Sequence, residues 1–341
     1  MEEKNILKAI KLISNGQDLT FELANSSMDE IMRGDVTPAQ FGSFIMGLKM
    51  KGETSTEIAG LATGMREKSL KVELDEPLLD TCGTGGDGLK TFNISTAVAF
   101  VVAGAGVKVA KHGNRAISGS SGSADVLEEM GVKITLSPYS VKKCIEDIGI
   151  GFIFAQSFHP AMKFAAVPRK EIGIRTIFNT LGPLMNPARA NAQVFGMADP
   201  GLANLVTQFL TKQSVHHALV VHGEDGLDEI SLAGKTDVWE LKDGTVSTYT
   251  VMPDDFGLDV IDNKELKVKS IKESASVIKS ILDGDLGPRR DVVLANASAA
   301  LVAADRAKTF RDGVLIARDA IDSGQSKRVL DHLIELSQKL N

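Results

Sequence analysis

The chain has 341 residues, of which 43% are hydrophobic and 24% charged, and its formal net charge is −6. This composition is typical of a soluble globular protein that is long enough for two domains. The negative balance argues against a nucleic-acid-binding protein, because such proteins usually have a basic surface. No stretch is apolar enough to span a membrane, and the charged, amphipathic N-terminus lacks the apolar core of a signal peptide.

The chain contains two cysteines, Cys82 and Cys144. Two are too few for a disulfide framework or a zinc site. They are expected to be small buried thiols in a reducing compartment. The composition therefore predicts a cytoplasmic location.

Residues 1–70 show only helical patterns. Apolar residues recur at helical spacing over 6–13, 19–33, 37–50 and 54–70. Pro38 directly follows Thr37, which is the usual order of residues at the start of a helix. These patterns predict a small all-helical domain.

After Pro77, short apolar strands alternate with helical stretches. Strands are predicted at 78–82, 107–110, 151–155 and 218–222, and helices at 96–104, 123–130, 140–148, 202–212, 274–282, 293–304 and 326–340. A hairpin is predicted at 239–250, with its turn at 242–244. Alternating strands and helices predict a mainly parallel central sheet flanked by helices. The expected fold class is α/β, with a helical domain at 1–70 and a larger α/β domain at 71–341.

The first predicted strand leads into a glycine-rich loop, GTGGDGLKTFNIST at 83–96. The glycines either make a tight turn or let the backbone approach phosphate oxygens, which N–H groups at a helix start bind. Gly83, Gly85 and Gly88 also fit a dinucleotide-binding fingerprint. However, Lys111 and His112 follow the next strand, where that fold needs an acid. A Walker A loop is excluded because no Gly-Lys-Ser/Thr follows.

The next loop, KHGNRAISGSSGS at 111–123, is rich in cationic and polar side chains. These side chains are expected at the tip of their strand and close to the glycine loop, because ligands bind at the carboxyl ends of parallel strands. Taken singly, Lys111 and Arg115 would be solvated charges and His112 a core histidine. Two facing loops of this composition favour a phosphate or pyrophosphate site.

Two adjacent acids, Asp228 and Glu229, follow a predicted buried strand and a glycine turn. Such a pair is either an exposed acidic turn or a magnesium site, because Mg²⁺ prefers oxygen ligands and often bridges substrate phosphates. A pyrophosphate site opposite this turn favours the magnesium interpretation.

Taken together, six segments of the chain resemble the anthranilate phosphoribosyltransferase family. They are GTGGD at 83–87, NIST at 93–96, KHGNR at 111–115, GSAD at 122–125, FHPAMKFAAVPRKEIGIRTIFNTLGPLMNP at 158–187 and GLDE at 226–229. The family transfers the phosphoribosyl group of phosphoribosyl pyrophosphate to the amine of anthranilate in tryptophan biosynthesis, with magnesium, and releases pyrophosphate. The resemblance implies that helices near 160–187 return to the helical domain, and that the protein is a homodimer joined through that domain.

The resemblance also implies roles for particular residues. Those implied to surround phosphoribosyl pyrophosphate are Gly83, Gly86, Asp87, Thr91, Asn93, Ile94, Ser95, Thr96, Lys111, His112, Gly113, Asn114, Arg115, Ala116, Ile117, Ser118, Gly119 and Ser123. Those implied to contact anthranilate are Gly83, His112, Asn114 and Arg169, and those implied to bind Mg²⁺ are Ser95, Asp228 and Glu229. Lys111 is expected to stabilise charge on the departing pyrophosphate, and no general acid or base is assigned.

Two departures from the family pattern lie near the expected anthranilate entrance. Phe164 stands where a histidine is frequent, and AAVPR at 165–169 reorders the usual proline and valine. They concern the shape of that entrance and leave the expected activity unchanged.

Two other functions compete with the transferase. A pyrimidine nucleoside phosphorylase shares the architecture, but the NIST and KHGNR segments and the Arg169 region favour the transferase. A non-enzymatic relative that binds nucleic acid would need a basic groove, whereas this chain is acidic. The expected partners are therefore small-molecule substrates and a second copy of the chain, without nucleic acid or membrane.

Overall fold

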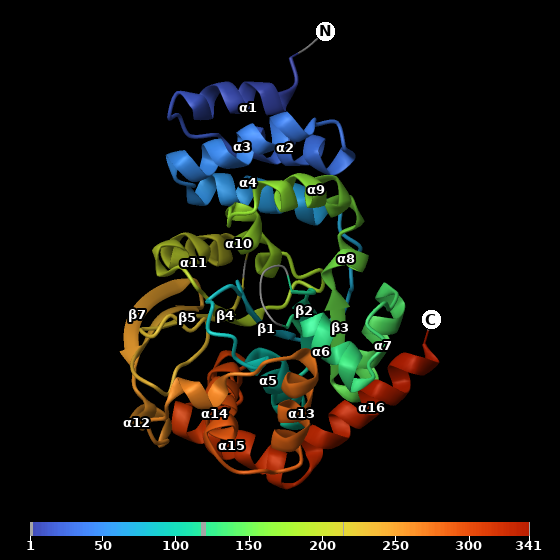
Figure 1. Cartoon of the computed structure of the whole chain (residues 1–341), viewed down its shortest axis with the longest axis vertical. Coiled ribbons are helices and arrows are strands. Elements are labelled where there is room, and N and C mark those ends of the chain that lie inside the picture. The colour runs from blue at the N-terminus through green and yellow to red at the C-terminus, as the bar shows by residue number, and fades with distance from the viewer. Residues whose placement is uncertain (1–2, 117–120, 214, 341) are drawn as a thin grey trace.

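The computed structural model describes residues 3–116, 121–213 and 215–340, which form a helical part above a larger α/β part (Figure 1). The helical part begins with α1 (Asn5–Ser14), α2 (Phe21–Arg33), α3 (Pro38–Lys51) and α4 (Ser55–Glu67). Thr20, Thr37 and Thr54 cap the last three helices, each accepting a backbone N–H from the first turn. These caps explain where the helices begin, and they confirm the helical pattern predicted for 1–70.

The α/β part is built on a seven-stranded sheet in the order β3-β2-β1-β4-β5-β6-β7. Its strands are β1 (Leu79–Gly83), β2 (Val109–Gly113), β3 (Ile150–Phe154), β4 (Ala192–Gly196), β5 (His217–Gly223), β6 (Thr236–Lys242) and β7 (Thr245–Val251). Strands β1 to β5 pair in parallel, and β6 and β7 add an antiparallel hairpin at one edge. The predicted mainly parallel sheet and the predicted hairpin are confirmed, while β4 had not been predicted.

Helices cover both faces of this sheet (Figure 1). The longer ones are α5 (Ile94–Gly104), α6 (Ser123–Met130), α7 (Pro138–Ile148), α11 (Ala203–Lys212), α13 (Ile271–Leu282), α14 (Pro288–Ala303), α15 (Phe310–Asp322) and α16 (Gln325–Lys339). The short ones are α8 (Ala155–Phe158), α12 (Pro253–Phe256), η1 (Pro160–Met162), η2 (Pro200–Leu202) and η3 (Asn263–Leu266). Helix α15 was missed by the sequence analysis. Among the described residues, none of the helices combines the length and apolarity that a membrane crossing requires.

Two helices from the middle of the chain return to the helical part. They are α9 (Lys163–Ile172) and α10 (Ile177–Leu184), and they pack on α2, α3 and α4. The ring of Phe178 on α10 lies with its centroid 5.3 Å from that of Phe41 on α3. Helices from 160–187 therefore complete the helical part, as the resemblance implied.

The sheet separates two hydrophobic cores, and β5 contributes to both. Leu219 and Val221 belong to the core that includes α5, α14 and α16. Ala218 and Val220 belong to the core shared with α10, α11 and the N-terminal helices. Successive side chains on a strand point to opposite faces, so this alternation follows from a strand buried on both sides. Helix α11 contacts α4 on one side and β5 and β6 on the other, so it links the helical part to one face of the sheet.

Strand β2 differs from its predicted position. It was predicted at 107–110, but it runs over Val109–Gly113. Lys111 and His112 therefore lie inside the strand, with 3% and 6% of their surfaces exposed. The expectation that they leave the tip of the strand as exposed side chains is wrong. An apolar run predicts that the strand ends before the charged Lys111. The strand continues because Lys111 is buried and has partners from other segments.

Candidate active site

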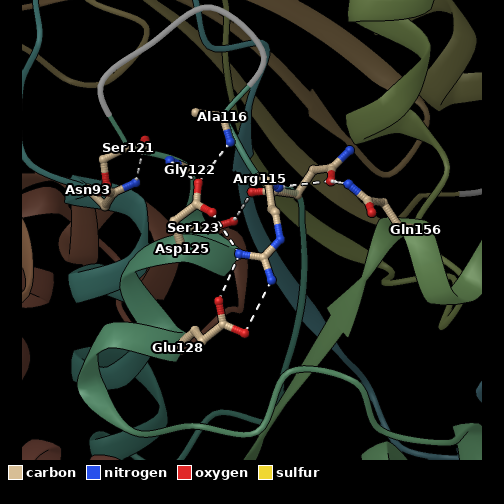
Figure 2. Close-up of polar contacts among 10 residues, drawn as sticks. Asn93, Arg115, Ala116, Ser121, Gly122, Ser123, Asp125, Glu128 and Gln156 are labelled. Carbon is tan, nitrogen blue, oxygen red and sulfur yellow. Dashed lines mark hydrogen bonds and ion pairs between the residues drawn. The ribbon is translucent and has the colours of Figure 1, made fainter. Parts of the chain in front are cut away.

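The loops after β1, β2 and β5 meet at the carboxyl edge of the sheet. The side chain of Asn93, at the end of the glycine loop, donates to the backbone carbonyl of Ser121 at 3.2 Å and accepts from its hydroxyl at 2.8 Å (Figure 2). The predicted meeting of the glycine loop with the loop after β2 is therefore observed.

The acidic pair joins the same cluster from the loop after β5. The Gly85 N–H donates to Oδ2 of Asp228 at 2.7 Å, and the Ser95 N–H donates to Oε1 of Glu229 at 3.1 Å. Asp228 therefore contacts the glycine loop, and Glu229 contacts the first turn of α5. Three segments that are distant in the sequence form one polar cleft.

The electrostatics of the acidic pair suit a divalent cation. Asp228 and Glu229 are half-buried. Loss of water, together with the charge of Asp87, raises the pKa of Asp228 to about 7. Loss of water and the charge of Asp228 raise the pKa of Glu229. Two carboxylates that are costly to ionise side by side would be stabilised by a cation between them.

No cluster of three or more histidine, cysteine or acidic side chains in the described part of the chain is arranged to hold a metal. Asp228 and Glu229 therefore supply a two-carboxylate site. Such a site fits Mg²⁺, which usually takes one or two protein carboxylates and completes its shell with water and substrate phosphates.

Strands β1 and β2 separate beneath this cleft. Their only register pair is Leu79 with Val109, whereas β2 and β3 share five such pairs. The next backbone groups are satisfied by side chains instead. Oδ1 of Asp80 accepts the His112 N–H at 3.1 Å, and Nζ of Lys111 donates to the carbonyl of Thr81 at 2.6 Å.

Asn186, in the segment after α10, adds a third side chain that bonds to the strand backbone between β1 and β2. Its Nδ2 donates to the Ala110 carbonyl at 2.8 Å and to Oδ2 of Asp80 at 2.7 Å. A buried carboxylate, a buried ammonium and a buried amide thus replace ladder hydrogen bonds between β1 and β2. Every polar group in such a network needs a partner because an unpaired buried charge is costly.

Lys111 places a buried cation beside the glycine loop and the start of α5. Burial lowers its pKa, and the charge of Asp80 opposes that change. Burial likewise raises the pKa of Asp80 to about 6, against the effect of Lys111. Nζ of Lys111 lies 3.4 Å from the hydroxyl of Ser95. An ammonium and the N-terminus of α5 are therefore placed together, and both favour an anion.

Arg115 points toward α6 and is already paired (Figure 2). Its Nη1 lies 2.9 Å from Oδ1 of Asp125 and 2.8 Å from Oε2 of Glu128, and its guanidinium lies over the Phe154 ring. Its charge is thus neutralised by two carboxylates. In this structure Arg115 fixes the loop after β2.

Asp125 holds both ends of that loop. Its Oδ2 accepts the N–H groups of Ala116 at 2.9 Å and of Gly122 at 3.1 Å, while Oδ1 faces Arg115 (Figure 2). The sequence analysis quoted Asp125 within GSAD but gave it no role. The predicted substrate contacts Ile117, Ser118 and Gly119 lie outside the described residues.

Two histidines form a buried pair beside the cleft. The ring centroids of His112 and His159 lie 5.3 Å apart. Burial lowers the pKa of His112 and lowers that of His159 to about 4, so both rings are neutral near pH 7. Nε2 of His112 and both ring nitrogens of His159 have no hydrogen-bond partner among the described residues. His159 was missed by the sequence analysis, although it lies in the segment quoted for the resemblance.

Two arginines reach this region from the returning helices. Arg169 on α9 is half-buried, and its guanidinium carbon lies 5.4 Å from the centroid of the Phe178 ring. Burial lowers the pKa of Arg169. Arg175 lies between α9 and α10, and its Nη1 donates to the Gly85 carbonyl at 2.6 Å. Arg169 had been predicted as a site residue, whereas Arg175 had not.

The other predicted residues lie on the same edge of the sheet. Gly83, Gly86, Asp87 and Thr91 lie in β1 or the glycine loop, Asn93, Ile94, Ser95 and Thr96 at the start of α5, and Gly113, Asn114, Ala116 and Ser123 between β2 and α6. No hydrogen bond within the described part of the chain joins Arg169 to Gly83, His112 or Asn114. The cleft therefore contains a phosphate-binding type of loop, two candidate magnesium ligands and a separate group of histidine and arginine side chains.

The sequence of the chain matches two family models. Residues 7–69 match the helical bundle domain of a glycosyl transferase family, and residues 75–327 match its a/b domain. Anthranilate phosphoribosyltransferase from Dehalococcoides mccartyi is 52% identical over 98% of this chain and 99% of its own length. The chain belongs to the anthranilate phosphoribosyltransferase family.

Solved structures of the anthranilate phosphoribosyltransferase family agree with this assignment. The enzyme from Thermus thermophilus is 38% identical, with a TM-score of 0.92, over 98% of this chain and 100% of that one. The enzyme from Saccharomyces cerevisiae in complex with PRPP and Mg is 28% identical, with a TM-score of 0.91, over 99% of each chain. The family fold, a helical domain with a larger α/β domain, is therefore confirmed for this chain.

Proposed function

We propose that this protein transfers the phosphoribosyl group of phosphoribosyl pyrophosphate to the amine of anthranilate. The products would be N-(5-phosphoribosyl)anthranilate and pyrophosphate, in tryptophan biosynthesis. The observation that carries the proposal is the cleft in which the glycine loop, Lys111 and the acidic pair meet, in a chain 52% identical to an anthranilate phosphoribosyltransferase.

The glycine loop and the start of α5 are proposed to hold phosphoribosyl pyrophosphate. A Cβ atom at Gly85 or Gly88 would meet open space, so these glycines leave room for phosphate oxygens, and N–H groups at the helix start favour their negative charge. Lys111 would stabilise the charge that develops on the departing pyrophosphate. Its partial desolvation strengthens that interaction, because electrostatic energies grow as the effective dielectric constant falls.

Asp228, Glu229 and Ser95 are proposed to hold Mg²⁺. Two half-buried carboxylates and a hydroxyl are hard oxygen donors, as this ion prefers. When bound, Mg²⁺ supplies charge neutralisation for the pyrophosphate leaving group. The raised pKa of Asp228 supports this assignment, because loss of water and the charge of Asp87 outweigh the opposing effects of the Gly85 N–H and Arg175.

Arg169, with His112 and Asn114, is proposed to receive anthranilate. A planar guanidinium can form two hydrogen bonds with a carboxylate, and the guanidinium of Arg169 lies over the Phe178 ring. His159 joins this group because its ring contacts His112. Neutral histidine rings offer a polar but uncharged wall to an aromatic ligand.

The chemistry requires little from a general base. The aromatic amine is neutral near pH 7 and already carries its lone pair. Departure of pyrophosphate builds positive charge on the ribose, as in other glycosyl transfers. The protein's tasks are then to position the amine against the anomeric carbon, to exclude water and to stabilise the leaving group.

Three further expectations accompany this proposal. The division between the domains is placed at residues 70 and 71. The protein is expected to form a homodimer through its helical part, and to act in the cytoplasm on small-molecule substrates without nucleic acid.

The test mixes purified protein with Mg²⁺, phosphoribosyl pyrophosphate and anthranilate, and follows the loss of anthranilate fluorescence. We expect a loss that requires all three components. Folded protein that leaves anthranilate unchanged would overturn the proposal. Release of a base from nucleosides with phosphate, or a salt-dependent gel shift with single-stranded DNA, would then support one of the two competing functions.

A further inference from the structure

Arg175 has a rigid origin on the helical side of the cleft. It lies in the short segment 173–176 between α9 and α10, both of which pack on the helical part. Gly173 ends α9 in a left-handed conformation with φ 67°, and Thr176 begins α10 as its N-cap. The backbone on both sides of Arg175 is therefore fixed by helix ends.

The side chain of Arg175 crosses from the helical part to the glycine loop. Its Nη1 donates to the carbonyl of Gly85 at 2.6 Å, and its Nη2 lies 3.5 Å from the carbonyl of Thr84. Among the ion pairs between described residues, none involves Arg175. A half-buried guanidinium whose hydrogen-bond partners are carbonyls thus directs its positive charge at this loop, where it also acts on the carboxylate of Asp228.

Gly86 makes the close approach of Arg175 possible. A Cβ atom at this position would lie 1.7 Å from Nη1 of Arg175, and the backbone has φ 76°. Both facts require glycine here, and they place the guanidinium directly against the loop backbone.

Both backbone groups of Gly85 make hydrogen bonds to side chains. Its N–H donates to Asp228, the proposed magnesium ligand, and its carbonyl accepts from Arg175. Asp228 and Arg175 therefore both contact Gly85, so a diphosphate that Asp228 helped to hold would be close to the guanidinium. Phosphate oxygens carry negative charge that carbonyl oxygens lack, and a guanidinium can pair with phosphate through two parallel hydrogen bonds, so phosphate competes well with the two carbonyls.

We propose that Arg175 binds the diphosphate group of phosphoribosyl pyrophosphate from the helical side of the cleft. The inference rests on the proposed function, because it takes that substrate as the ligand. On binding, Arg175 exchanges its carbonyl partners for phosphate oxygens and ties the substrate to the helical part. The helical part thus contributes a ligand to the diphosphate, in addition to its proposed role for anthranilate.

The test separates the two halves of the substrate by isothermal titration calorimetry. Pyrophosphate with Mg²⁺ and, separately, ribose 5-phosphate are titrated into the parent, Arg175→Ala and Arg175→Lys. We expect Arg175→Ala to weaken pyrophosphate binding by about 10- to 100-fold, since a hydrogen bond to a charged group is lost. Ribose 5-phosphate binding should change by less than about twofold, and Arg175→Lys should recover part of the pyrophosphate affinity.

Arg311→Ala is the matched control. Arg311 is an exposed arginine that also donates to a backbone carbonyl, that of Asp254 at 2.6 Å. The Arg311→Ala variant should bind pyrophosphate and ribose 5-phosphate with the affinities of the parent. Unchanged pyrophosphate affinity in Arg175→Ala would overturn the inference. Equal weakening of both ligands would also overturn it, because it would mean that Arg175 only supports the loop.

The outcome is independent of the activity test. A parent that consumes anthranilate, with an Arg175→Ala variant that binds pyrophosphate normally, would refute the inference and leave the proposed function standing. A parent that binds pyrophosphate through Arg175 but leaves anthranilate unchanged would refute the function and support the diphosphate site.

Discussion

The two loops that form the cleft are held in different ways. The glycine loop after β1 is bonded through Gly85 to Asp228 and Arg175, both of which are proposed to meet the substrate. The loop after β2 is held at both ends by Asp125, together with Arg115. A ligand would compete with the contacts of the first loop and leave those of the second intact. A ligand would therefore displace contacts of the glycine loop, whereas the described ends of the second loop keep theirs.

Lys111 lies beneath both loops, so its loss should have the largest effect. We expect Lys111→Ala to lower the free energy of unfolding by about 3–5 kcal/mol, because Asp80 then remains buried without its cation. Urea denaturation followed by circular dichroism measures the change. Lys108→Ala, which removes an ammonium bonded only to the carbonyls of Ile145 and Glu146, is the control and should cost less than about 1 kcal/mol. A loss below that level for Lys111→Ala would contradict the proposed burial of this charge.

Asp125→Ala tests the second loop alone. It removes the acceptor of two backbone N–H groups and of Arg115, and we expect a loss of about 2–3 kcal/mol in the free energy of unfolding. Glu128→Ala removes only the more exposed partner of Arg115 and should cost less than about 1 kcal/mol. Similar losses in the two variants would show that Asp125 does not hold the loop.

Gly86→Ala tests the first loop alone. We expect a loss of about 1–2 kcal/mol, because alanine is strained at a positive φ and its Cβ would clash with Arg175. Combining Gly86→Ala with Arg175→Ala should recover part of this loss, since the clash disappears. Thermal or urea denaturation of both single variants and the double variant gives the coupling energy. If the two stability losses simply add, Gly86 and Arg175 are not coupled, which would contradict the proposed clash.

The smallest expected effect is a pH dependence of the second loop. Burial alone would raise the pKa of Asp125. Hydrogen bonds from Ala116 and Arg115 outweigh burial and lower this pKa. A carboxylate with a lowered pKa in the folded state stabilises the fold above its unfolded pKa of about 3.9, and that contribution is lost as the pH falls through the folded value. The stability difference between the parent and Asp125→Asn should therefore be constant from pH 7 to about pH 5 and shrink below about pH 4. Asp254→Asn, at a side chain that is 96% exposed, should show no such trend.

The sequence predicted the elements that depend on local chemistry. The helices of 1–70 follow from apolar spacing and threonine caps, and the hairpin at 239–250 follows from its glycine turn. The meeting of the glycine loop with the loop after β2 also followed, because parallel strands end at the same edge. Each of these inferences uses only residues that are near one another or a general rule of sheet topology.

Apart from the missed β4 and α15, the errors involve partners that are distant in the sequence. The end of β2 was missed because Lys111 and His112 are buried by contacts with Thr81, Asp80 and other segments. Arg175 and His159 acquire their positions only when α9 and α10 return to the helical part. Asp125 was visible in a quoted segment, but its role depends on how the loop closes. Local patterns carry no signal for such contacts.

The return of α9 and α10 has a consequence for biosynthesis. Helices α1 to α4 leave the ribosome first, yet the aromatic contact between Phe41 and Phe178 awaits a segment that is translated after β1, β2 and β3. Domains that are continuous in sequence can fold as units during synthesis, beginning with the N-terminal one. Here the first domain to be translated cannot be finished until part of the second domain has been translated. Its apolar surface stays uncovered until nearly half of the α/β domain has emerged, and the nascent chain must be kept from aggregating during that interval.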